Sequence, residues 1–308
     1  MSIREGRAPN SSSPESLMVV NLSTYRIEGE FDAGGCGTVL VGSHARSKQP
    51  VVMKMASKEV DRLLLATERR IYARLPKARG WPRLIDTGTY RKRDVLVLER
   101  LGPSLQDLLN LCGGRFGLKT VSQLALQLLD RLETYHELGY VHRDLKPDNV
   151  LLGRGTTRKT LHMIDFGLAE PYRHPRTGEH IAQDAFFPFA GTIEFAPVFA
   201  HLEYTPSRRD DILSLAYMLV FLLRGGLPWY GTEERFDPDE ALLLKLCITP
   251  SELCRGLPAE FQRLTEYALQ MEFCDAPDYT ELKRMFRNLL RQHSMQHDLH
   301  FDWNRFGC

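Results

Sequence analysis

The hydrophobic periodicity of this chain changes once, at Gly102-Pro103, and this change constrains the fold more than any other feature. Before the dipeptide, short apolar runs with the length and composition of strands dominate, at residues 39–41, 51–53 and 95–98. One stretch between them, residues 60–75, instead repeats its inward positions every three or four residues, which predicts a helix. The first third of the chain is therefore predicted to form a small sheet that carries one helix.

After Gly102-Pro103 the pattern becomes that of long helices. Steps of three and four residues give the segment 121–135 one apolar face, and Thr120 with Gln123 fits a capping box at its start. The run 212–223 is apolar apart from one serine and shorter than the roughly 18 residues that span a bilayer, so we expect a buried core helix. Further helical patterns cover residues 240–246, 259–271 and 280–291.

A sheet-rich first third followed by a helical remainder predicts an α+β, two-lobed architecture. Residues 1–20 are polar and without periodicity, so we expect a disordered tail there. Residues 21–101 are expected to form the smaller N-terminal lobe, and residues 102–308 the larger, mainly helical C-terminal lobe. Because ligands commonly bind at such boundaries, we expect the functional site between the lobes.

The composition narrows the classes of function. The 308 residues carry 40 basic and 39 acidic side chains, which argues against a protein that binds nucleic acid or a charged membrane through bulk electrostatics. The 6 cysteines are dispersed without a Cys-x-x-Cys pair, so neither a disulfide framework nor a structural zinc site is expected. Residues 1–16 hold no apolar stretch of the kind found in secretory signals. We therefore expect a cytoplasmic protein, with the nucleus as an alternative.

Two segments carry the residues that point to chemistry. Residues 141–149 read VHRDLKPDN, and Asp165-Phe166-Gly167 begins sixteen residues beyond Asn149. Phosphoryl transfer requires a carboxylate to orient an attacking hydroxyl, oxygen ligands for Mg²⁺, and a cation to offset the developing charge. Asp144 suits the first role, Asn149 and Asp165 the second, and Lys146 the third. The alternative interpretation makes Asp144 and Asp165 ordinary turn or capping residues.

The two segments resemble the catalytic-loop and metal-binding signatures of the eukaryotic protein kinase superfamily. The resemblance extends upstream. Lys54, in the run VVMK, resembles the strand-borne lysine that contacts the α- and β-phosphates of ATP, and Glu68 resembles its helical ion-pair partner.

The glycine-rich loop of that superfamily is matched less completely. Alignment on Val39 puts Gly37 and Gly34 at the third and second glycine positions, whereas Asp32 occupies the first. Glycines suit this loop because backbone N–H groups can then approach phosphate oxygens. An acid at the first position would place a like charge near the triphosphate, so we expect a reduced nucleotide affinity.

Within the superfamily, the chain resembles the casein kinase 1 family from about residue 25 to residue 303. The stretches that carry the resemblance are LERLGPSL at residues 98–105, SRRDD at 207–211, LPW at 227–229 and FDWN at 301–304. Ala196-Pro197 is followed by Val198 in place of the glutamate of the usual Ala-Pro-Glu, which also fits this family.

The resemblance implies an ATP- and Mg²⁺-dependent enzyme that acts as a monomer on Ser or Thr hydroxyls of protein substrates. It implies that Leu98 lies behind the adenine, that the backbone from Glu99 to Leu101 bonds the adenine, and that Asp211 braces the catalytic loop. The lysine at position 146 marks the serine/threonine branch of the superfamily. With Tyr172 and Thr177 as the few candidate phosphorylation sites before Thr192, constitutive activity is expected.

The chain departs from the casein kinase 1 pattern near its substrate-binding segment. Glu194 stands where an arginine is usual, and Phe187 where a lysine is common. Because these replacements reverse the local charge, we expect weak preference for substrates already phosphorylated near the target. The alternative is that Glu194 pairs with Arg208 or Arg209 and leaves the preference unchanged. A cluster of Phe186, Phe187 and Phe189 is expected to pack against the helical lobe.

Two further functions compete with a serine/threonine kinase. A pseudokinase would keep the fold as a binding or scaffold module, and Asp32 and Glu194 favour it, whereas the filled chemical positions oppose it. A small-molecule kinase would share the catalytic loop, but the peptide-binding segment around Gly191-Thr192 opposes that function.

Overall fold

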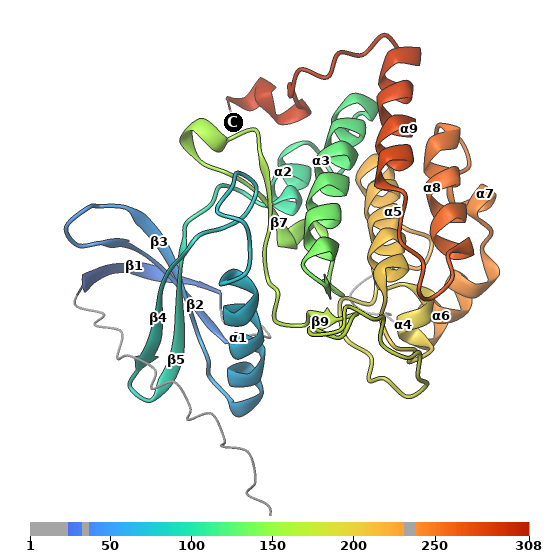
Figure 1. Ribbon diagram of the computed structural model, residues 1–308. Helices are drawn as coiled ribbons and strands as arrows, with labels where there is room; N and C mark the ends of the chain where they lie inside the picture. The colour runs from blue at the N-terminus through green and yellow to red at the C-terminus, as the bar shows by residue number, and fades with distance from the viewer. Residues whose placement is uncertain (1–23, 33–36, 231–237, 308) are drawn as a thin grey trace, which may run out of the picture.

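The structure is a computed structural model that describes residues 24–32, 37–230 and 238–307. The expected tail at residues 1–20 lies outside this range. The described part has an antiparallel sheet in its N-terminal region and helices in its C-terminal region, which confirms the predicted two-lobed α+β architecture (Figure 1).

The N-terminal lobe is a 5-stranded antiparallel sheet with the strand order β1-β2-β3-β5-β4. One helix, α1, packs against strands β4 and β5. The bounds of these elements are β1 Tyr25–Asp32, β2 Thr38–His44, β3 Pro50–Met55, α1 Glu59–Tyr72, β4 Leu84–Tyr90 and β5 Arg93–Glu99.

Alternation along β3 decides which side chains face the rest of the molecule. Val51 and Met53 point to the outer face of the sheet, where they form a small core with Val95 and Val97 of β5. Side chains alternate along a strand, so Lys54 lies on the opposite face, where its register partner is Leu96. Leu96 belongs to the core that also holds buried residues of α1. The sheet pleat therefore directs Lys54 toward α1 and the C-terminal lobe.

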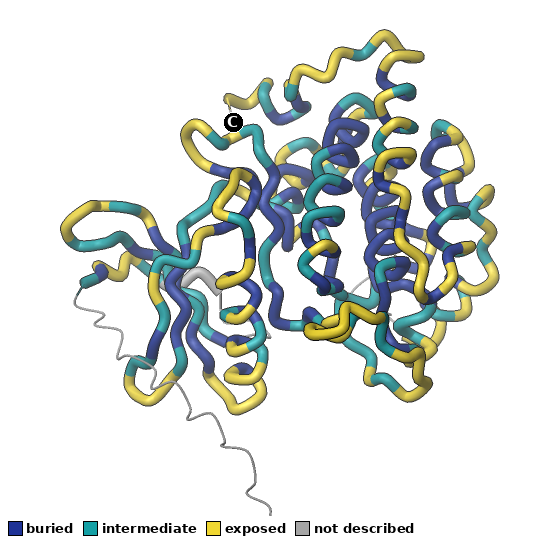
Figure 2. Tube along the Cα trace, viewed as in Figure 1, coloured by how far each residue is buried: buried dark blue, intermediate teal, exposed yellow. Residues whose placement is uncertain are grey.

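The C-terminal lobe is built around four helices that lie side by side in Figure 1: α3, α5, α8 and α9. The predicted core helix is confirmed, because every residue of α5 from Arg209 to Leu222 is buried. Figure 2 shows this buried centre flanked by exposed outer faces. The helix bounds are α2 Leu105–Leu111, α3 Leu118–Glu137, α4 Val198–His201, α5 Arg208–Arg224, α6 Pro238–Cys247, α7 Pro250–Leu253, α8 Ala259–Gln270 and α9 Tyr279–Gln292.

Short strand pairs hold the loops between the lobes. Strand β7 pairs with β8, and β6 pairs with β9, so the loops that follow β6 and β8 are both fixed at their ends. The bounds are β6 Tyr140–Val141, β7 Val150–Leu152, β8 Leu161–Met163 and β9 Glu170–Pro171, with 3-10 turns at Pro147–Asn149, Gly155–Thr157 and Asp302–Phe306.

The start of α3 corrects one prediction. The helix begins at Leu118 with Gly117 as its N-cap, so Thr120 and Gln123 lie inside it and form no capping box. The carboxylate of Asp302, distant in sequence, accepts a hydrogen bond from the Gly117 amide at 2.6 Å and takes the place of a local cap. Thr120 accepts from the Asp302 amide, and Gln123 bonds the adjacent C-terminal backbone. These two polar residues therefore anchor the C-terminal segment.

None of the helices in the described ranges is both long and apolar enough to cross a bilayer. Among the described cysteines, Cys247, Cys254 and Cys274 are free thiols.

Candidate active site

Three charged side chains from distant parts of the chain converge where the lobes meet. Lys54 Nζ on β3 lies 3.0 Å from the Glu68 carboxylate on α1 and 2.9 Å from the Asp165 carboxylate in the loop after β8. Glu68 is almost fully buried, whereas 24% of the Asp165 side chain is exposed. Each side chain comes from a different element, so the position of Lys54 depends on the packing of both lobes.

The electrostatics of this cluster favour the charged forms of Lys54 and Asp165. Burial alone would lower the pKa of Lys54, but the carboxylates of Glu68 and Asp165 outweigh burial and raise it above the usual value. Burial acts to raise the pKa of Asp165, but the Lys54 ammonium outweighs it and the pKa lies below the usual value. The cluster therefore presents a permanent ammonium beside an ionised carboxylate.

Phe166 fixes the loop that carries Asp165. Its ring is fully buried and packs edge-on against Tyr72 of α1 at 5.2 Å and stacks on Tyr135 of α3 at 5.3 Å. Asp165 has a φ of 64°, in the left-handed region that is strained for a residue with a side chain. Buried packing of its neighbour thus holds Asp165 in an unfavourable backbone conformation that directs its carboxylate toward Lys54.

The catalytic loop holds the Asp144 carboxylate from several sides. Asp144 Oδ1 accepts hydrogen bonds from the Thr192 amide at 2.8 Å and the Thr192 hydroxyl at 2.7 Å. Asp144 Oδ2 accepts from the Asn149 amide Nδ2 at 2.9 Å, and Lys146 Nζ lies 3.3 Å from it. Lys146 also donates to the Thr192 hydroxyl oxygen at 2.8 Å. The four residues form one connected polar network.

Two oxygens of this site have no hydrogen-bond partner in the described part of the chain. Asn149 uses its Nδ2 for Asp144, which leaves Oδ1, and Asp165 uses Oδ1 for Lys54, which leaves Oδ2. Carboxylate and amide oxygens suit Mg²⁺, which takes few protein ligands and completes its shell with water and substrate phosphates. No cluster of three or more His, Cys, Asp or Glu side chains that could hold a metal alone occurs in the described residues. The donor set fits Mg²⁺ bound together with phosphates.

Asp211 on α5 braces the catalytic loop. One carboxylate oxygen accepts from the His142 amide at 2.7 Å and the other from the Arg143 amide at 3.0 Å, while His136 on α3 contacts the first oxygen at 2.8 Å. Burial acts to raise the pKa of Asp211, but the hydrogen bonds and charge interactions with His136 and His142 together outweigh burial and lower it. The bonds hold Arg143 at a φ of 71°. The expected bracing contact is thus present.

The segment between the lobes leaves one backbone donor unused. The amide of Glu99 donates to Arg83 O at 3.0 Å and that of Arg100 to Pro50 O at 3.3 Å. The amide of Leu101 makes no hydrogen bond within the described residues, and Leu98, near the end of β5, is buried. An apolar wall next to an unpaired N–H is the kind of surface that an adenine ring can occupy.

The glycine-rich region is described only in part. Gly34 and the side chain of Asp32 lie outside the described residues, so the expected effects of both stay predictions. Gly37 has a φ of 103°, and a Cβ there would lie 2.2 Å from the Met55 carbonyl oxygen. Val39 pairs with Lys54 across β2 and β3. Here the close approach that requires glycine is to the neighbouring strand.

The three phenylalanines before Gly191 do not form the expected cluster. Phe186 has a φ of 79° and is 87% exposed, so the chain turns and the rings separate. Phe187 lies under the Arg143 guanidinium at 4.8 Å, and Phe189 lies 5.0 Å from the His201 ring. Only Phe187 and Phe189 therefore contact the helical lobe.

Arg208 and Arg209 have partners other than Glu194. Arg208 lies over the Tyr172 ring at 4.5 Å and donates to Cys274 O. Arg209 lies over the Phe199 ring at 3.8 Å and donates to Met271 O, and within the described residues no ion pair joins either arginine to Glu194. This contradicts the alternative in which Glu194 forms a structural ion pair with one of them. Tyr172 is buried, and its hydroxyl donates to His136 O at 2.7 Å, so among the candidate phosphorylation sites it is inaccessible.

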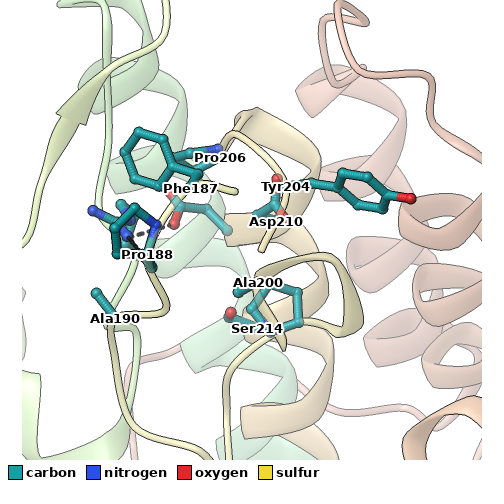
Figure 3. Close-up of a pocket in the computed structure, with 11 residues that line it drawn as sticks. Phe187, Pro188, Ala190, Ala200, Tyr204, Pro206, Asp210 and Ser214 are labelled. Carbon is teal, nitrogen blue, oxygen red and sulfur yellow. Dashed lines mark hydrogen bonds between the residues drawn. The ribbon is translucent and has the colours of Figure 1, made fainter. Parts of the chain in front are cut away.

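A small cavity lies under the segment that precedes Gly191. Figure 3 shows Phe187 and Pro188 on one side of it and Asp210 and Ser214 of α5 on the other. Its volume of about 20 Å³ is enough for roughly one water molecule. Nucleotide sites need several hundred Å³, so this cavity is not the nucleotide site.

Reasoning from the sequence missed Lys245. This residue of α6 is buried, and its ammonium contacts the backbone that follows Thr192. The available signal was a single cation inside the apolar stretch ALLLKLC. The pattern identified the helix but assigned the lysine no partner.

Six of the residues expected at the site form two polar clusters in the structure. Lys54, Glu68 and Asp165 form one cluster, and Asp144, Lys146 and Asn149 form the other. The sequence model of the family described as Protein kinase domain matches residues 25–296, which is most of the chain. The chain therefore belongs to the protein kinase domain family.

Proposed function

We propose that this kinase is a serine/threonine protein kinase similar to casein kinase 1, which transfers the γ-phosphate of ATP to Ser or Thr hydroxyls of proteins. One observation carries the proposal: the Asp144 carboxylate is held by Thr192, Asn149 and Lys146 at a site that also contains the Lys54 and Asp165 charge pair.

Nucleotide binding would use both sides of the lobe boundary. Lys54 would donate to the α- and β-phosphates, with Glu68 holding its ammonium in place. The unpaired amide of Leu101 and the carbonyl of Glu99 would bond the adenine edge, with Leu98 packing behind it. Gly37, just before β2, and Val39, within it, would cover the nucleotide.

Transfer would need little covalent chemistry from the protein. The substrate hydroxyl oxygen forms a bond to the γ-phosphorus, the bond from that phosphorus to the ADP oxygen breaks, and Asp144 accepts the hydroxyl proton. Lys146 offsets negative charge on the transferring group. Asp165 and Asn149 would hold Mg²⁺, which neutralises the phosphate charge when it is bound. The enzyme thus contributes position and charge.

Specificity for Ser and Thr is supported by Lys146. Its ammonium joins Asp144 to Thr192, so the substrate-binding segment and the catalytic loop share one cation. A lysine at this position is typical of serine/threonine kinases. The stretches LERLGPSL, SRRDD, LPW and FDWN support the resemblance to casein kinase 1.

Substrate preference is expected to depart from that family. The Arg143 guanidinium lies over the Phe187 ring, and Arg208 and Arg209 also lie over aromatic rings. Each of these cations therefore already has a partner within the protein and is less available to bind a substrate phosphate. Glu194 adds a negative charge in the same segment. We propose that the enzyme has weak preference for phosphate-primed substrates. Assays of matched primed and unprimed peptides test this, and strong selectivity for the primed peptide would refute it.

The rival function is a pseudokinase that binds partners without transferring phosphate. The contacts among Lys54, Asp165, Asp144 and Asn149 favour catalysis over that role. ADP release from Mg²⁺-ATP in the presence of casein tests the proposal. The Lys54→Ala variant should lose turnover by orders of magnitude while its thermal unfolding stays cooperative. Turnover equal to that of the wild type would refute the assignment of Lys54.

A further inference from the structure

A buried lysine lies beneath the part of the chain that receives the substrate. We define the substrate segment as residues 191–198. It begins beside the catalytic loop, because the amide and hydroxyl of Thr192 both bond the Asp144 carboxylate. A polypeptide that presents a hydroxyl to Asp144 must therefore pass along this segment. Lys245, on α6, contacts the segment from the opposite side and is only 5% exposed.

The ammonium of Lys245 forms hydrogen bonds with two main-chain carbonyls and one histidine ring. Nζ donates to the carbonyl oxygens of Ile193 and Ala196, the latter at 2.8 Å, and lies 3.1 Å from Nε2 of His201 on α4. Two of the three acceptors belong to the substrate segment, and the third belongs to the helix that follows it. One side chain thus fixes both ends of a short stretch of backbone.

A second donor acts on the same stretch. The indole Nε1 of Trp229 donates to the Glu194 carbonyl oxygen at 2.8 Å, between the two carbonyls that Lys245 bonds. The Lys245 ammonium also lies 5.2 Å from the centre of the Trp229 ring and 5.6 Å from that of Tyr217 on α5. Lys245 and Trp229 together therefore donate to the carbonyl oxygens of Ile193, Glu194 and Ala196.

The sequence of the substrate segment explains why Lys245 bonds its backbone and not its side chains. Residues 195–198 read FAPV, so no side chain there can form an ion pair with a neighbouring helix. Within the described residues, Lys245 has no carboxylate within ion-pair distance. Carbonyl oxygens are the acceptors that such a stretch offers, and a buried ammonium is a strong donor to them.

The charge of Lys245 is costly to bury, which argues for a specific use. Burial lowers the pKa of Lys245 to about 7, and the carboxylate of Glu194 opposes that shift only in part. The other titratable groups that face it are His201, whose pKa is lowered to about 4 by burial and then by Lys245, and the buried Tyr217. His201 is therefore neutral near pH 7 and can accept a hydrogen bond from the ammonium.

We propose that Lys245 is a positioning residue for the protein substrate: by bonding the carbonyls of Ile193 and Ala196, it sets the conformation of the substrate segment beside Asp144. The inference rests on the proposed function, since it assigns the segment to polypeptide binding. It also makes a structural claim that holds whether or not phosphate is transferred.

The Lys245→Met variant tests the kinetic part, because Met keeps the length of the side chain without its donors. The KM for a protein substrate such as casein should rise about tenfold, as expected for loss of hydrogen bonds that position the segment, while the KM for ATP stays within about twofold. Lys283→Met is the matched control. Lys283, on α9, is also mostly buried but pairs with Asp130 and Glu133, so both KM values should stay unchanged.

Hydrogen exchange tests the structural part and covers the case in which the Met variant folds poorly. In Trp229→Phe, which keeps an aromatic ring but removes the donor to Glu194 O, amides of residues 191–198 should exchange faster than in the wild type. The same increase should occur in Lys245→Met.

The two proposals fail in different ways. A wild-type protein without transfer activity would overturn the proposed function, while faster exchange in the variants would still support the structural role. Unchanged exchange and unchanged casein KM in both variants would overturn the inference, as would an equal loss of casein and ATP affinity in Lys245→Met.

Discussion

The Thr192 hydroxyl donates a 2.7 Å hydrogen bond to Asp144 Oδ1, the same oxygen that accepts from the Thr192 amide at 2.8 Å. Thr192, the second residue of the substrate segment, therefore bonds the proposed catalytic base directly. A shift of the segment would move Asp144 or remove two of its hydrogen bonds. We therefore expect changes in the packing beneath the substrate segment to alter the position of Asp144.

The first prediction concerns this hydroxyl. Thr192→Val replaces it with a methyl group of similar size, so Asp144 and Lys146 both lose a partner. Hydrogen bonds to charged groups contribute about 1.5–3 kcal/mol, so kcat should fall roughly 10- to 100-fold. Steady-state kinetics check this, with Thr192→Ser as the control that keeps the hydroxyl. Equal activity of the Val and Ser variants would contradict the role of the bond.

The second prediction concerns the ion pair on α1. Glu68→Gln removes the charge that holds Lys54 Nζ at 3.0 Å and leaves the ammonium with Asp165 alone. The kcat/KM for ATP should fall about tenfold or more, because Lys54 would no longer be held for the phosphates. Glu59→Gln on the same helix is the control, since the Glu59 side chain is 79% exposed. An equal fall in kcat/KM for ATP in Glu68→Gln and Glu59→Gln would argue against a specific role for Glu68.

The third prediction concerns the backbone at Gly191. Its φ is +105°, and a Cβ there would lie 2.4 Å from the Arg143 carbonyl oxygen in the catalytic loop. Gly191→Ala should therefore destabilise the fold by more than the ~1 kcal/mol of an unfavourable φ alone. Gly178→Ala separates the two effects, because Gly178 also has a positive φ, +75°, but has open space around it. The free energy of unfolding would be measured in urea. An equal decrease in Gly191→Ala and Gly178→Ala would contradict the steric account.

The fourth prediction is a pH dependence of stability. Burial holds the pKa of Lys245 at about 7, well below its unfolded value of 10.5, so between these pH values the unfolded chain binds more protons. The contribution of Lys245 to the free energy of unfolding must then rise with pH between about 7 and 10.5, by up to about 1.4 kcal/mol per pH unit. Below about pH 7 this contribution stays constant. Lys245→Met should lack this rise. Urea unfolding at pH 6.5 to 9.5 that shows parallel profiles for the two proteins would refute the assignment.

Much of the fold follows from hydrophobic periodicity. The run 212–223 could be assigned to a buried helix because its apolar residues leave no polar face, and α5 confirms this. The start of α3 could not be assigned, because the group that caps it, Asp302, lies 185 residues from Gly117 in the sequence. Local patterns predict local caps, whereas this cap forms only after the C-terminal segment docks on α3.

The candidate site likewise contains residues that the sequence predicts and contacts that it does not. Short motifs identified Asp144, Asn149 and Asp165, because phosphoryl transfer requires these residue types at fixed spacings. Motifs could not reveal the contact of Lys245 with the substrate segment, because its acceptors are backbone carbonyls, which every residue carries. The separation of Phe186 from Phe187 depends on a positive φ that an ordinary residue rarely adopts.

The most direct test of the central claim is the transfer of phosphate itself. Purified wild-type protein and Asp144→Asn would be incubated with Mg²⁺-ATP and dephosphorylated casein, and the modified residues would be identified by mass spectrometry. The account predicts new phosphate on Ser and Thr with the wild type, and a loss of at least about 100-fold with Asp144→Asn, whose amide cannot accept the hydroxyl proton. Equal incorporation by both proteins, or none by the wild type, would contradict it.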